Sequence, residues 1–204
     1  MITVVDYGIG NIRAFVNIYE KLQISVKTAR NIEDLKDAEK LILPGVGSFD
    51  FAMGNLENSG MKDGLNHLVL EKKVPVLGVC LGMQLMADAS DEGKSKGLGW
   101  IKGQVKKIDA AKVPHQSKLP HMGWNEVCFT KKSVLLDDVE NNSLFYFLHS
   151  YYLDCYQKDK VLGVSDFAGE FASAVHHENI YGTQFHPEKS HSRGEKLLFN
   201  FAKL

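Results

Sequence analysis

Short β-rich runs alternate with amphipathic stretches through the first half of the chain, and this alternation constrains the fold more than any other feature. Strands are predicted at residues 2–5, 24–28, 41–43 and 74–79. Helices are predicted at 12–22, 49–71 and 81–89. Strand, loop and helix repeated in this order predict an α/β fold, in which an open, mostly parallel sheet carries helices on both faces.

The second half of the chain contains more strand patterns than helix patterns. Strand-like runs lie at 103–108, 124–129, 145–153, 161–166, 171–176 and 180–185. We expect them to add antiparallel or mixed strands to the parallel core, followed by a last helix over 192–203, with a polar loop at 109–118. No linker, repeat or low-complexity segment divides the 204 residues, so 1–204 is predicted to be a single domain.

The charge balance and the cysteines argue against several classes of function. With 24 basic and 25 acidic side chains the net charge is −1, so neither nucleic acid nor a membrane is an expected partner. The first residues form a strand pattern without a basic n-region or a long apolar run, which predicts a cytoplasmic location. Cys80, Cys128 and Cys155 stand at wide spacing and suggest neither disulfides nor zinc ligands, so no metal and no cofactor is expected.

Cys80 lies where a buried strand is predicted to meet a helix, in the sequence Gly-Val-Cys-Leu-Gly-Met-Gln at 78–84. A sharp strand-to-helix turn of this kind projects a nucleophile, and the flanking glycines let the backbone turn and the substrate approach. The helix N-terminus favours a thiolate and a developing oxyanion. A free cysteine is more often a small buried side chain, as we expect for Cys128 and Cys155, but this context favours a nucleophile at Cys80.

A histidine and a carboxylate lie two residues apart in Gln-Phe-His-Pro-Glu at 184–188. In an extended segment His186 and Glu188 point to one side, and Pro187 is expected to keep the segment extended. A carboxylate beside an imidazole fixes its tautomer and stabilises its protonated form, as a base that takes a thiol proton requires. Alone, a His-Pro-Glu sequence is more often a surface turn.

The sequence Pro-Gly-Val-Gly at 44–47 follows another predicted parallel strand. Its glycines leave backbone N–H groups free to face a substrate carbonyl oxygen, although such a sequence more commonly makes a plain turn. Like the segments around Cys80 and His186, it falls at the carboxyl end of a predicted strand, the edge where open α/β sheets bind their ligands. The coincidence of three segments at this edge predicts an active site there.

These three segments, in this order and spacing, resemble the class I glutamine amidotransferases over essentially the whole chain. Asp-Tyr-Gly-Ile-Gly-Asn at 6–11, Pro-His-Met-Gly-Trp-Asn at 120–125 and His-Pro-Glu-Lys-Ser at 186–190 are similar to one branch, the glutaminase subunits of imidazole glycerol phosphate synthases in histidine biosynthesis. The resemblance implies a flavodoxin-like sheet and the hydrolysis of glutamine to glutamate and ammonia through an acyl-enzyme.

The resemblance also implies a role for each site residue. Cys80 would be the nucleophile, His186 the general base and acid, and Glu188 the residue that orients His186. Backbone N–H groups at Val46 or Gly47 and at Leu81 would bind the oxyanion. The residues implied to lie along the glutamine pocket are Gln84, which would contact the amino-acid end of the substrate, and His149, Ser150 and Tyr151. The residues implied to face a synthase subunit are Met122, Trp124, Asn125, Tyr146 and Lys189.

Ammonia released in water would be protonated, so it must pass directly to an acceptor. The chain has no phosphate-binding glycine fingerprint and no length left for an acceptor domain, so we expect the synthase to be another polypeptide in a heterodimer. Met122 and Trp124 are candidate interface residues, because exposed aromatic side chains are favoured at interfaces. A position in the core on a strand is a nearly equally good interpretation of both.

Three other functions compete with the histidine-pathway glutaminase. The run Phe-Leu-His-Ser-Tyr-Tyr at 147–152 is also similar to paralogous subunits that supply ammonia to a sugar amidotransferase in surface-polysaccharide biosynthesis. The others are an independent thiol hydrolase and a catalytically silent binding protein, and the intact Cys80, His186 and Glu188 argue against the last. Asp88, Asp91 and Glu92 are expected to form a solvated helix end.

Overall fold

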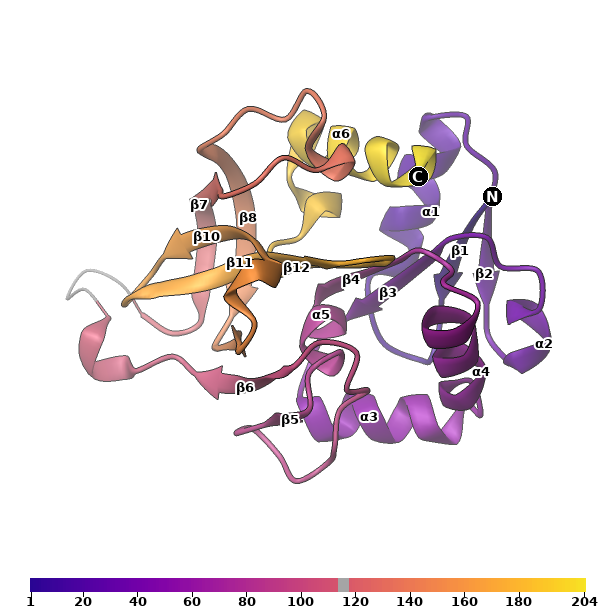
Figure 1. Ribbon diagram of the computed structural model, residues 1–204, viewed down its shortest axis with the longest axis horizontal. Helices are drawn as coiled ribbons and strands as arrows, with labels where there is room; N and C mark the ends of the chain where they lie inside the picture. The colour runs from indigo at the N-terminus through magenta and orange to yellow at the C-terminus, as the bar shows by residue number, and fades with distance from the viewer. Residues whose placement is uncertain (114–117) are drawn as a thin grey trace.

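The computed structural model describes residues 1–113 and 118–204, and a nine-stranded sheet forms its centre (Figure 1). The strand order is β2-β1-β3-β4-β12-β11-β10-β7-β8. The first five strands in this order are parallel to one another: β2 (Val26–Ala29), β1 (Ile2–Val5), β3 (Leu41–Gly45), β4 (Val76–Cys80) and β12 (Ile180–Thr183). The others pair antiparallel: β11 (Glu170–His177), β10 (Val161–Asp166), β7 (His121–Phe129) and β8 (Ser143–His149). The predicted α/β fold, with a parallel core and antiparallel or mixed strands added by the second half, is confirmed. Two second-half strands differ in place: β12 pairs parallel with β4 inside the core, and the strand predicted at 103–108 belongs to a separate small sheet.

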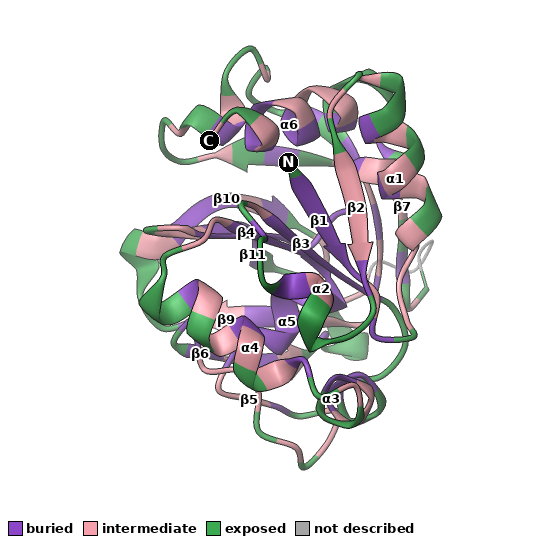
Figure 2. Ribbon diagram, turned by 90° about the vertical axis from the view of Figure 1, so that its right-hand side faces the viewer, coloured by how far each residue is buried: buried purple, intermediate pink, exposed green. Residues whose placement is uncertain are grey.

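Helices cover both faces of the sheet (Figures 1 and 2). α1 (Ile12–Lys21) and α6 (His191–Lys203) lie on one face. The opposite face carries α2 (Ile32–Leu35), α3 (Phe49–Asn58), α4 (Lys62–Asn66) and α5 (Leu81–Leu85). It also carries a small sheet of β5 (Ala89–Ser90), β6 (Gly103–Lys107) and β9 (Tyr151–Cys155). Shorter turns are the π-helical His67–Glu71 and the 3-10 segments Ala110–Lys112, Val134–Leu136, Lys158–Lys160 and Pro187–Lys189.

The parallel strands are buried on both faces because successive side chains enter different cores. Along β3, Leu41 and Leu43 join the core under α3 and α5, whereas Ile42 joins the core under α1 and α6. This alternation follows from the two-residue period of a strand. It explains why these segments read as continuous apolar runs in the sequence rather than as alternating ones.

Three predicted elements differ from the structure. The helix predicted over 81–89 ends at Leu85, because the carbonyl groups of Leu85 and Ala87 accept hydrogen bonds from Leu98 and Gly99 in the following loop. The run 145–153 is two strands, because β8 pairs with β7 in the large sheet while β9 pairs with β6 in the small one. The helix predicted over 49–71 is broken between Asn58 and Lys62.

The predicted loop at 109–118 contains the 3-10 turn Ala110–Lys112, and residues 114–117 lie outside the described part of the chain. The short elements α2 and β5 are additions that the sequence pattern does not predict. Across the described residues, no helix has the length and apolar character needed to cross a membrane.

Candidate active site

Cys80 ends β4 and immediately precedes α5, with φ +54° and ψ −112°. A non-glycine residue in this region is strained, and such strain concentrates at functional sites. The turn is held by close packing of α5 on β3: a Cβ at Gly82 would lie 1.9 Å from the Leu43 carbonyl oxygen. Only glycine fits at position 82, so the predicted sharp strand-to-helix turn at Cys80 is present and its downstream glycine has a steric cause.

His186 lies three residues after β12, where its N–H donates to the Tyr146 carbonyl oxygen at 2.8 Å. Its Nδ1 is 2.8 Å from Glu188 Oε1, and the two side chains are only 3% and 1% exposed. Contrary to the prediction, the segment is not extended after His186, because Pro187 begins a 3-10 turn that ends at Lys189. Proline is well tolerated at the first position of a helical turn, and this turn brings Glu188 onto His186.

The protonation of His186 depends on its two partners. Burial alone would lower the pKa of His186, but hydrogen bonding with Cys80 and with Glu188 outweighs burial and raises the pKa to about 10. The site therefore favours an imidazolium beside the Cys80 sulfur. Gln184 Nε2 also donates to Cys80 Sγ at 3.6 Å. These contacts are those of a thiol nucleophile paired with a base and its orienting carboxylate.

A cavity of about 310 Å³ opens in front of Cys80 and His186. It is lined by Val46, Gly47, Cys80, Leu81, Gln84, Glu92, Pro120, Leu148, His149, Ser150, Tyr151, His186 and Lys189. The structure thus brings together every residue predicted for the oxyanion site and the glutamine pocket, although they come from three separate parts of the sequence. Glu188 stands behind His186 and does not line the cavity.

Backbone donors are available at the predicted oxyanion site. Within the described residues, neither Val46 nor Gly47 uses its N–H in a hydrogen bond. Gly47 has φ +97°, and no atom lies within 4 Å of the place where its Cβ would be, so the loop borders open space there. Tyr7 anchors the same loop, since its buried hydroxyl donates to the Pro44 carbonyl oxygen at 2.7 Å.

Gln84 lies in the cavity as predicted, but its amide nitrogen is occupied by the protein. Its Nε2 donates to the Tyr151 carbonyl oxygen at 2.8 Å and to Gln184 Oε1 at 3.0 Å. Both hydrogens are therefore used, and a direct contact with a ligand falls to its oxygen. The hydrogen bond from Gln84 to Tyr151 connects the helix α5 to the start of β9.

Glu92 is the lining residue that sequence reasoning placed wrongly. It was expected on a solvated helix end with Asp88 and Asp91, but the chain has left the helix and enters the small sheet. Glu92 Oε2 accepts the N–H of Phe49 at 2.8 Å, at the start of α3, and the side chain borders the cavity. Asp88 instead pairs with Lys102. No spacing rule in the sequence distinguishes Glu92 from the other two.

The residues predicted to face a partner form an exposed group beside the cavity. Met122 and Trp124 on β7 are 66% and 44% exposed, so the alternative of a core position is wrong. The Trp124 ring packs edge-on against Tyr146 with centroids 6.0 Å apart, and Lys189 Nζ lies 5.7 Å from the Tyr146 centroid. We call Met122, Trp124, Tyr146 and Lys189 the aromatic rim. Asn125 differs, because its side chain is hydrogen-bonded to neighbouring protein groups.

The other two cysteines are not both buried. Cys155 is buried in β9, as expected, but Cys128 is exposed, so the expectation of a core position for Cys128 is wrong. Cys128 falls an even number of residues after Met122 and Trp124 along β7 and therefore points to the same, outer face. Among the described residues, no group of His, Cys, Asp and Glu side chains could hold a metal ion.

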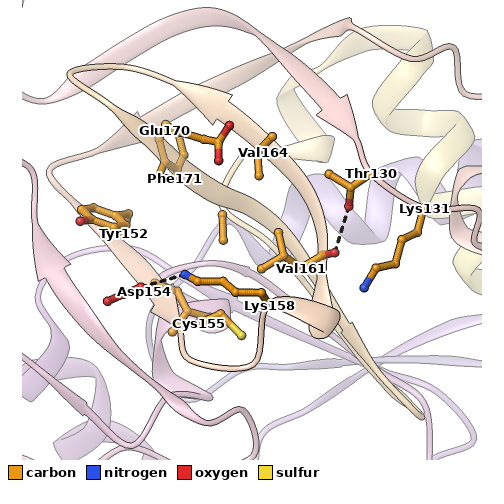
Figure 3. A pocket seen from close by; sticks show the side chains of 12 residues that line it. Thr130, Lys131, Tyr152, Asp154, Cys155, Lys158, Val161, Val164, Glu170 and Phe171 are labelled. Carbon is orange, nitrogen blue, oxygen red and sulfur yellow. Dashed lines mark hydrogen bonds and ion pairs between the residues drawn. The ribbon is translucent and has the colours of Figure 1, made fainter.

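A larger cavity, of about 480 Å³, lies between β9 and the strands β10 and β11 (Figure 3). Its side chains are of mixed character: Tyr152 and Phe171 are aromatic, while Asp154 and Lys158 form an ion pair of 3.3 Å. Neither Cys80, His186 nor Glu188 lines it. The chemistry therefore places the candidate active site in the smaller cavity at the carboxyl ends of the parallel strands.

Comparison with protein families gives a match over nearly the whole chain. The model of "Glutamine amidotransferase class-I" matches residues 3–204. The chain is 49% identical to the imidazole glycerol phosphate synthase subunit HisH of Leptospira borgpetersenii, over 100% of both chains. It is 48% identical to the subunit of the same name from Bdellovibrio bacteriovorus, again over 100% of both.

Solved structures share the fold at low sequence identity. A protein from Thermoplasma acidophilum, described as part of a putative GMP synthase, has a TM-score of 0.74 at 21% identity, covering 99% of this chain and 92% of that one. A structure described as a glutamine amidotransferase has a TM-score of 0.75 at 17% identity, covering 100% of this chain and 99% of that one. At these identities the likeness shows the arrangement of the α/β sheet and helices.

Proposed function

The chain belongs to the class I glutamine amidotransferase family, and we propose that it hydrolyses glutamine and delivers the ammonia to a synthase subunit in histidine biosynthesis. Relatives that are 42–49% identical over essentially their full length are named imidazole glycerol phosphate synthase subunits, which supports this assignment. The observation that carries the proposal is that Cys80 and His186 line one cavity of small-molecule size, while Glu188 is bonded to His186 at 2.8 Å.

The geometry supports an acyl-transfer mechanism. His186 holds the proton from Cys80, and the thiolate attacks the side-chain carbonyl carbon of glutamine. The N–H of Leu81 and that of Val46 or Gly47 bind the oxyanion of the tetrahedral intermediate. His186 then gives its proton to the leaving nitrogen, so ammonia departs and a glutamyl thioester remains. Water, deprotonated by His186, attacks the thioester and releases glutamate and the Cys80 thiol.

The cavity offers contacts for the rest of the substrate. Glutamine carries an ammonium group at its amino-acid end, and Glu92 is a carboxylate in the cavity wall that suits it. Gln84 and the segment from His149 to Tyr151 also line the cavity and are joined by the hydrogen bond from Gln84 to Tyr151. We assign the segment from His149 to Tyr151 to substrate binding. We assign Cys80, His186 and Glu188 to the chemical steps.

The synthase is proposed to be a separate subunit that docks on the aromatic rim as a heterodimer. Met122 and Trp124 expose a large apolar area, and Lys189 belongs both to the rim and to the cavity lining, so a partner bound there adjoins the place where ammonia is released. We also propose that residues 1–204 act as one domain, which the unbroken nine-stranded sheet supports. A cytoplasmic location is proposed from the biosynthetic role.

The test of this function is steady-state glutamine hydrolysis by the chain alone, with an imidazole glycerol phosphate synthase cyclase subunit, and with a sugar amidotransferase. We expect strong stimulation by the cyclase subunit with its acceptor, because a free glutaminase would waste glutamine. Cys80→Ser should abolish the activity and leave the fold intact, since serine keeps the volume but loses the reactive thiol. Cys128→Ser is the matched control and should hydrolyse glutamine at the full rate.

Three other outcomes of this test would contradict parts of the proposal. Stimulation only by the sugar amidotransferase would assign the chain to polysaccharide biosynthesis. A full rate without any partner would favour an independent hydrolase. Activity retained by Cys80→Ser would overturn the proposed nucleophile.

A further inference from the structure

Two buried histidines face each other behind the wall of the glutamine cavity. His121 on β7 and His149 at the end of β8 are opposite one another in the antiparallel register, with His121 Nδ1 3.0 Å from His149 Nε2. His149 lines the cavity, whereas His121 does not. The proposed mechanism uses neither imidazole, so the pair needs another explanation.

The direction of the hydrogen bonds in this pair is fixed by backbone groups at both ends. At one end, His149 Nδ1 is 2.8 Å from the Tyr151 carbonyl oxygen, which can only accept, so Nδ1 carries the hydrogen. The Nε2 of a neutral His149 must then accept, and its donor is the Nδ1–H of His121.

At the other end, the amide of Asn125 has one possible orientation. Its Oδ1 accepts the N–H of Glu126 at 2.8 Å, and its Nδ2 donates to the Asp166 carbonyl oxygen at 2.9 Å. The remaining Nδ2 hydrogen points to His121 Nε2 at 3.3 Å. A single directed chain therefore runs from Asn125 through His121 and His149 to Tyr151, and both imidazoles are the Nδ1–H tautomer.

The surroundings keep the pair neutral and His121 in place. Burial lowers the pKa of His121 to about 4, and burial together with the neighbouring His121 lowers the pKa of His149 to about 3. The His121 ring lies between Phe147 and Phe167, with centroids 4.9 and 4.1 Å away and interplanar angles of 22° and 14°. A ring stacked on both sides has little freedom to turn, so His121 is a rigid donor.

The hydrogen bonds continue from this pair to the nucleophile. The Tyr151 carbonyl that accepts from His149 also accepts from Gln84 Nε2 at 2.8 Å. Gln84 donates in turn to Gln184, whose Nε2 reaches Cys80 Sγ at 3.6 Å. The cavity wall formed by His149, Tyr151 and Gln84 is thus one connected unit with His121 at its base.

We propose that His121 is a positioning residue for glutamine binding, which fixes the tautomer and ring orientation of His149 and thereby the wall against which glutamine lies. His121 does not touch the substrate and takes no part in the chemistry. The proposal rests on the proposed glutaminase function and extends it to a residue outside the cavity.

The test is the kinetics of His121→Phe, assayed with the synthase subunit present. Phenylalanine keeps the ring between Phe147 and Phe167 but leaves His149 Nε2 without a donor. We expect the KM for glutamine to rise roughly tenfold, because a His149 ring without its donor can turn and no longer holds the wall in its binding arrangement, and kcat to change less than KM.

His176→Phe is the matched control. His176 also stacks on an aromatic ring, that of Tyr181 at 4.2 Å, and also bonds a backbone carbonyl oxygen, that of Glu178 at 2.8 Å, but it lies outside the cavity lining. Its KM should equal that of the wild type. A folded His121→Phe enzyme with the wild-type KM would overturn the proposal, and so would an equal rise in both variants.

A second measurement does not depend on the variant folding. In the wild-type protein labelled with ¹⁵N-histidine, two imidazoles should be neutral Nδ1–H tautomers at pH 7. An Nε2–H tautomer or a charged ring at either position would refute the directed chain. If the wild type hydrolyses no glutamine with any synthase subunit, the proposed function fails and the role of His121 in glutamine binding fails with it. If glutamine is hydrolysed but the tautomers differ, only the role of His121 fails.

Discussion

The conformation or charge of each of the three proposed catalytic side chains depends on a neighbouring group. Cys80 is held in a strained conformation by the turn into α5, and the contacts of His186 with Cys80 and Glu188 raise its pKa to about 10 against the effect of burial. Glu188 has one oxygen bonded to His186, and its other oxygen is buried without a partner among the described residues. An unpaired buried carboxylate oxygen is costly, so the charge of Glu188 is tolerable mainly because the imidazolium lies beside it.

Replacement of His186 and of Glu188 should have unequal effects. His186→Ala removes the base and acid, so glutamine hydrolysis should fall to near background, by roughly 10²–10⁴-fold or more. Glu188→Gln keeps a hydrogen-bonding oxygen near His186 Nδ1 but loses the charge that helps to raise the pKa of His186, so part of the activity should remain. Steady-state rates with the synthase subunit measure both. If Glu188→Gln were the more damaging change, the assigned roles would be wrong.

At the scale of elements, the close crossing of α5 over β3 constrains both the fold and the position of Cys80. The helix begins so close to the strand that the backbone at Gly82 lies against the Leu43 carbonyl, and the same contact aims Cys80 into the cavity. The stability of the fold and the geometry of the nucleophile therefore depend on one packing contact.

Gly82→Ala should destabilise the protein. The added Cβ would overlap the Leu43 carbonyl oxygen and force α5 away from β3, at a cost of about 3 kcal/mol, the upper end of overpacking effects. The melting temperature should fall by roughly 6–12 °C. Gly54→Ala in α3 is the control, because no atom lies within 4 Å of the added Cβ, and alanine favours a helix by about 1 kcal/mol. Equal melting temperatures for Gly82→Ala and the wild type would contradict this account.

The sequence predicted what is encoded locally. The strands of the parallel half, the turn at Cys80 and the pairing of His186 with Glu188 each follow from a few consecutive residues. The position of Glu92 depends on a loop that folds back to the start of α3, and the pairing of His121 with His149 depends on the register of two strands. Neither has a local pattern. Cys128 was misplaced because the outer face of β7 is open, whereas apolar runs elsewhere in the sheet are covered by helices.

At the scale of the whole molecule, the cavity and the aromatic rim adjoin each other, and Lys189 belongs to both. A partner bound over Met122 and Trp124 would come close to the place where His186 is proposed to protonate the departing ammonia. This arrangement supports the proposed docking of a synthase subunit on the aromatic rim.

Trp124→Ala should weaken binding of the synthase subunit. Large aromatic side chains at the centre of an interface commonly contribute about 2 kcal/mol or more, so the Kd should rise about thirtyfold. Calorimetric titration with the cyclase subunit measures this. Tyr156→Ala is the control, because Tyr156 is also an exposed aromatic residue, at 58%, but lies in the turn after β9, outside the rim. Unchanged affinity in Trp124→Ala would place the interface elsewhere.

The position of β12 in the sheet bears on how the protein is made. β12 follows every other strand in the sequence, yet it sits between β4 and β11 and joins the parallel half to the antiparallel half. While a ribosome is still synthesising the chain, the edge of β4 stays unpaired and His186 does not yet exist. An open strand edge is prone to association, so the nascent chain is most vulnerable at this stage. The same order of synthesis keeps Cys80 without its proposed base until the fold is closed, so we expect that an incomplete chain does not hydrolyse glutamine.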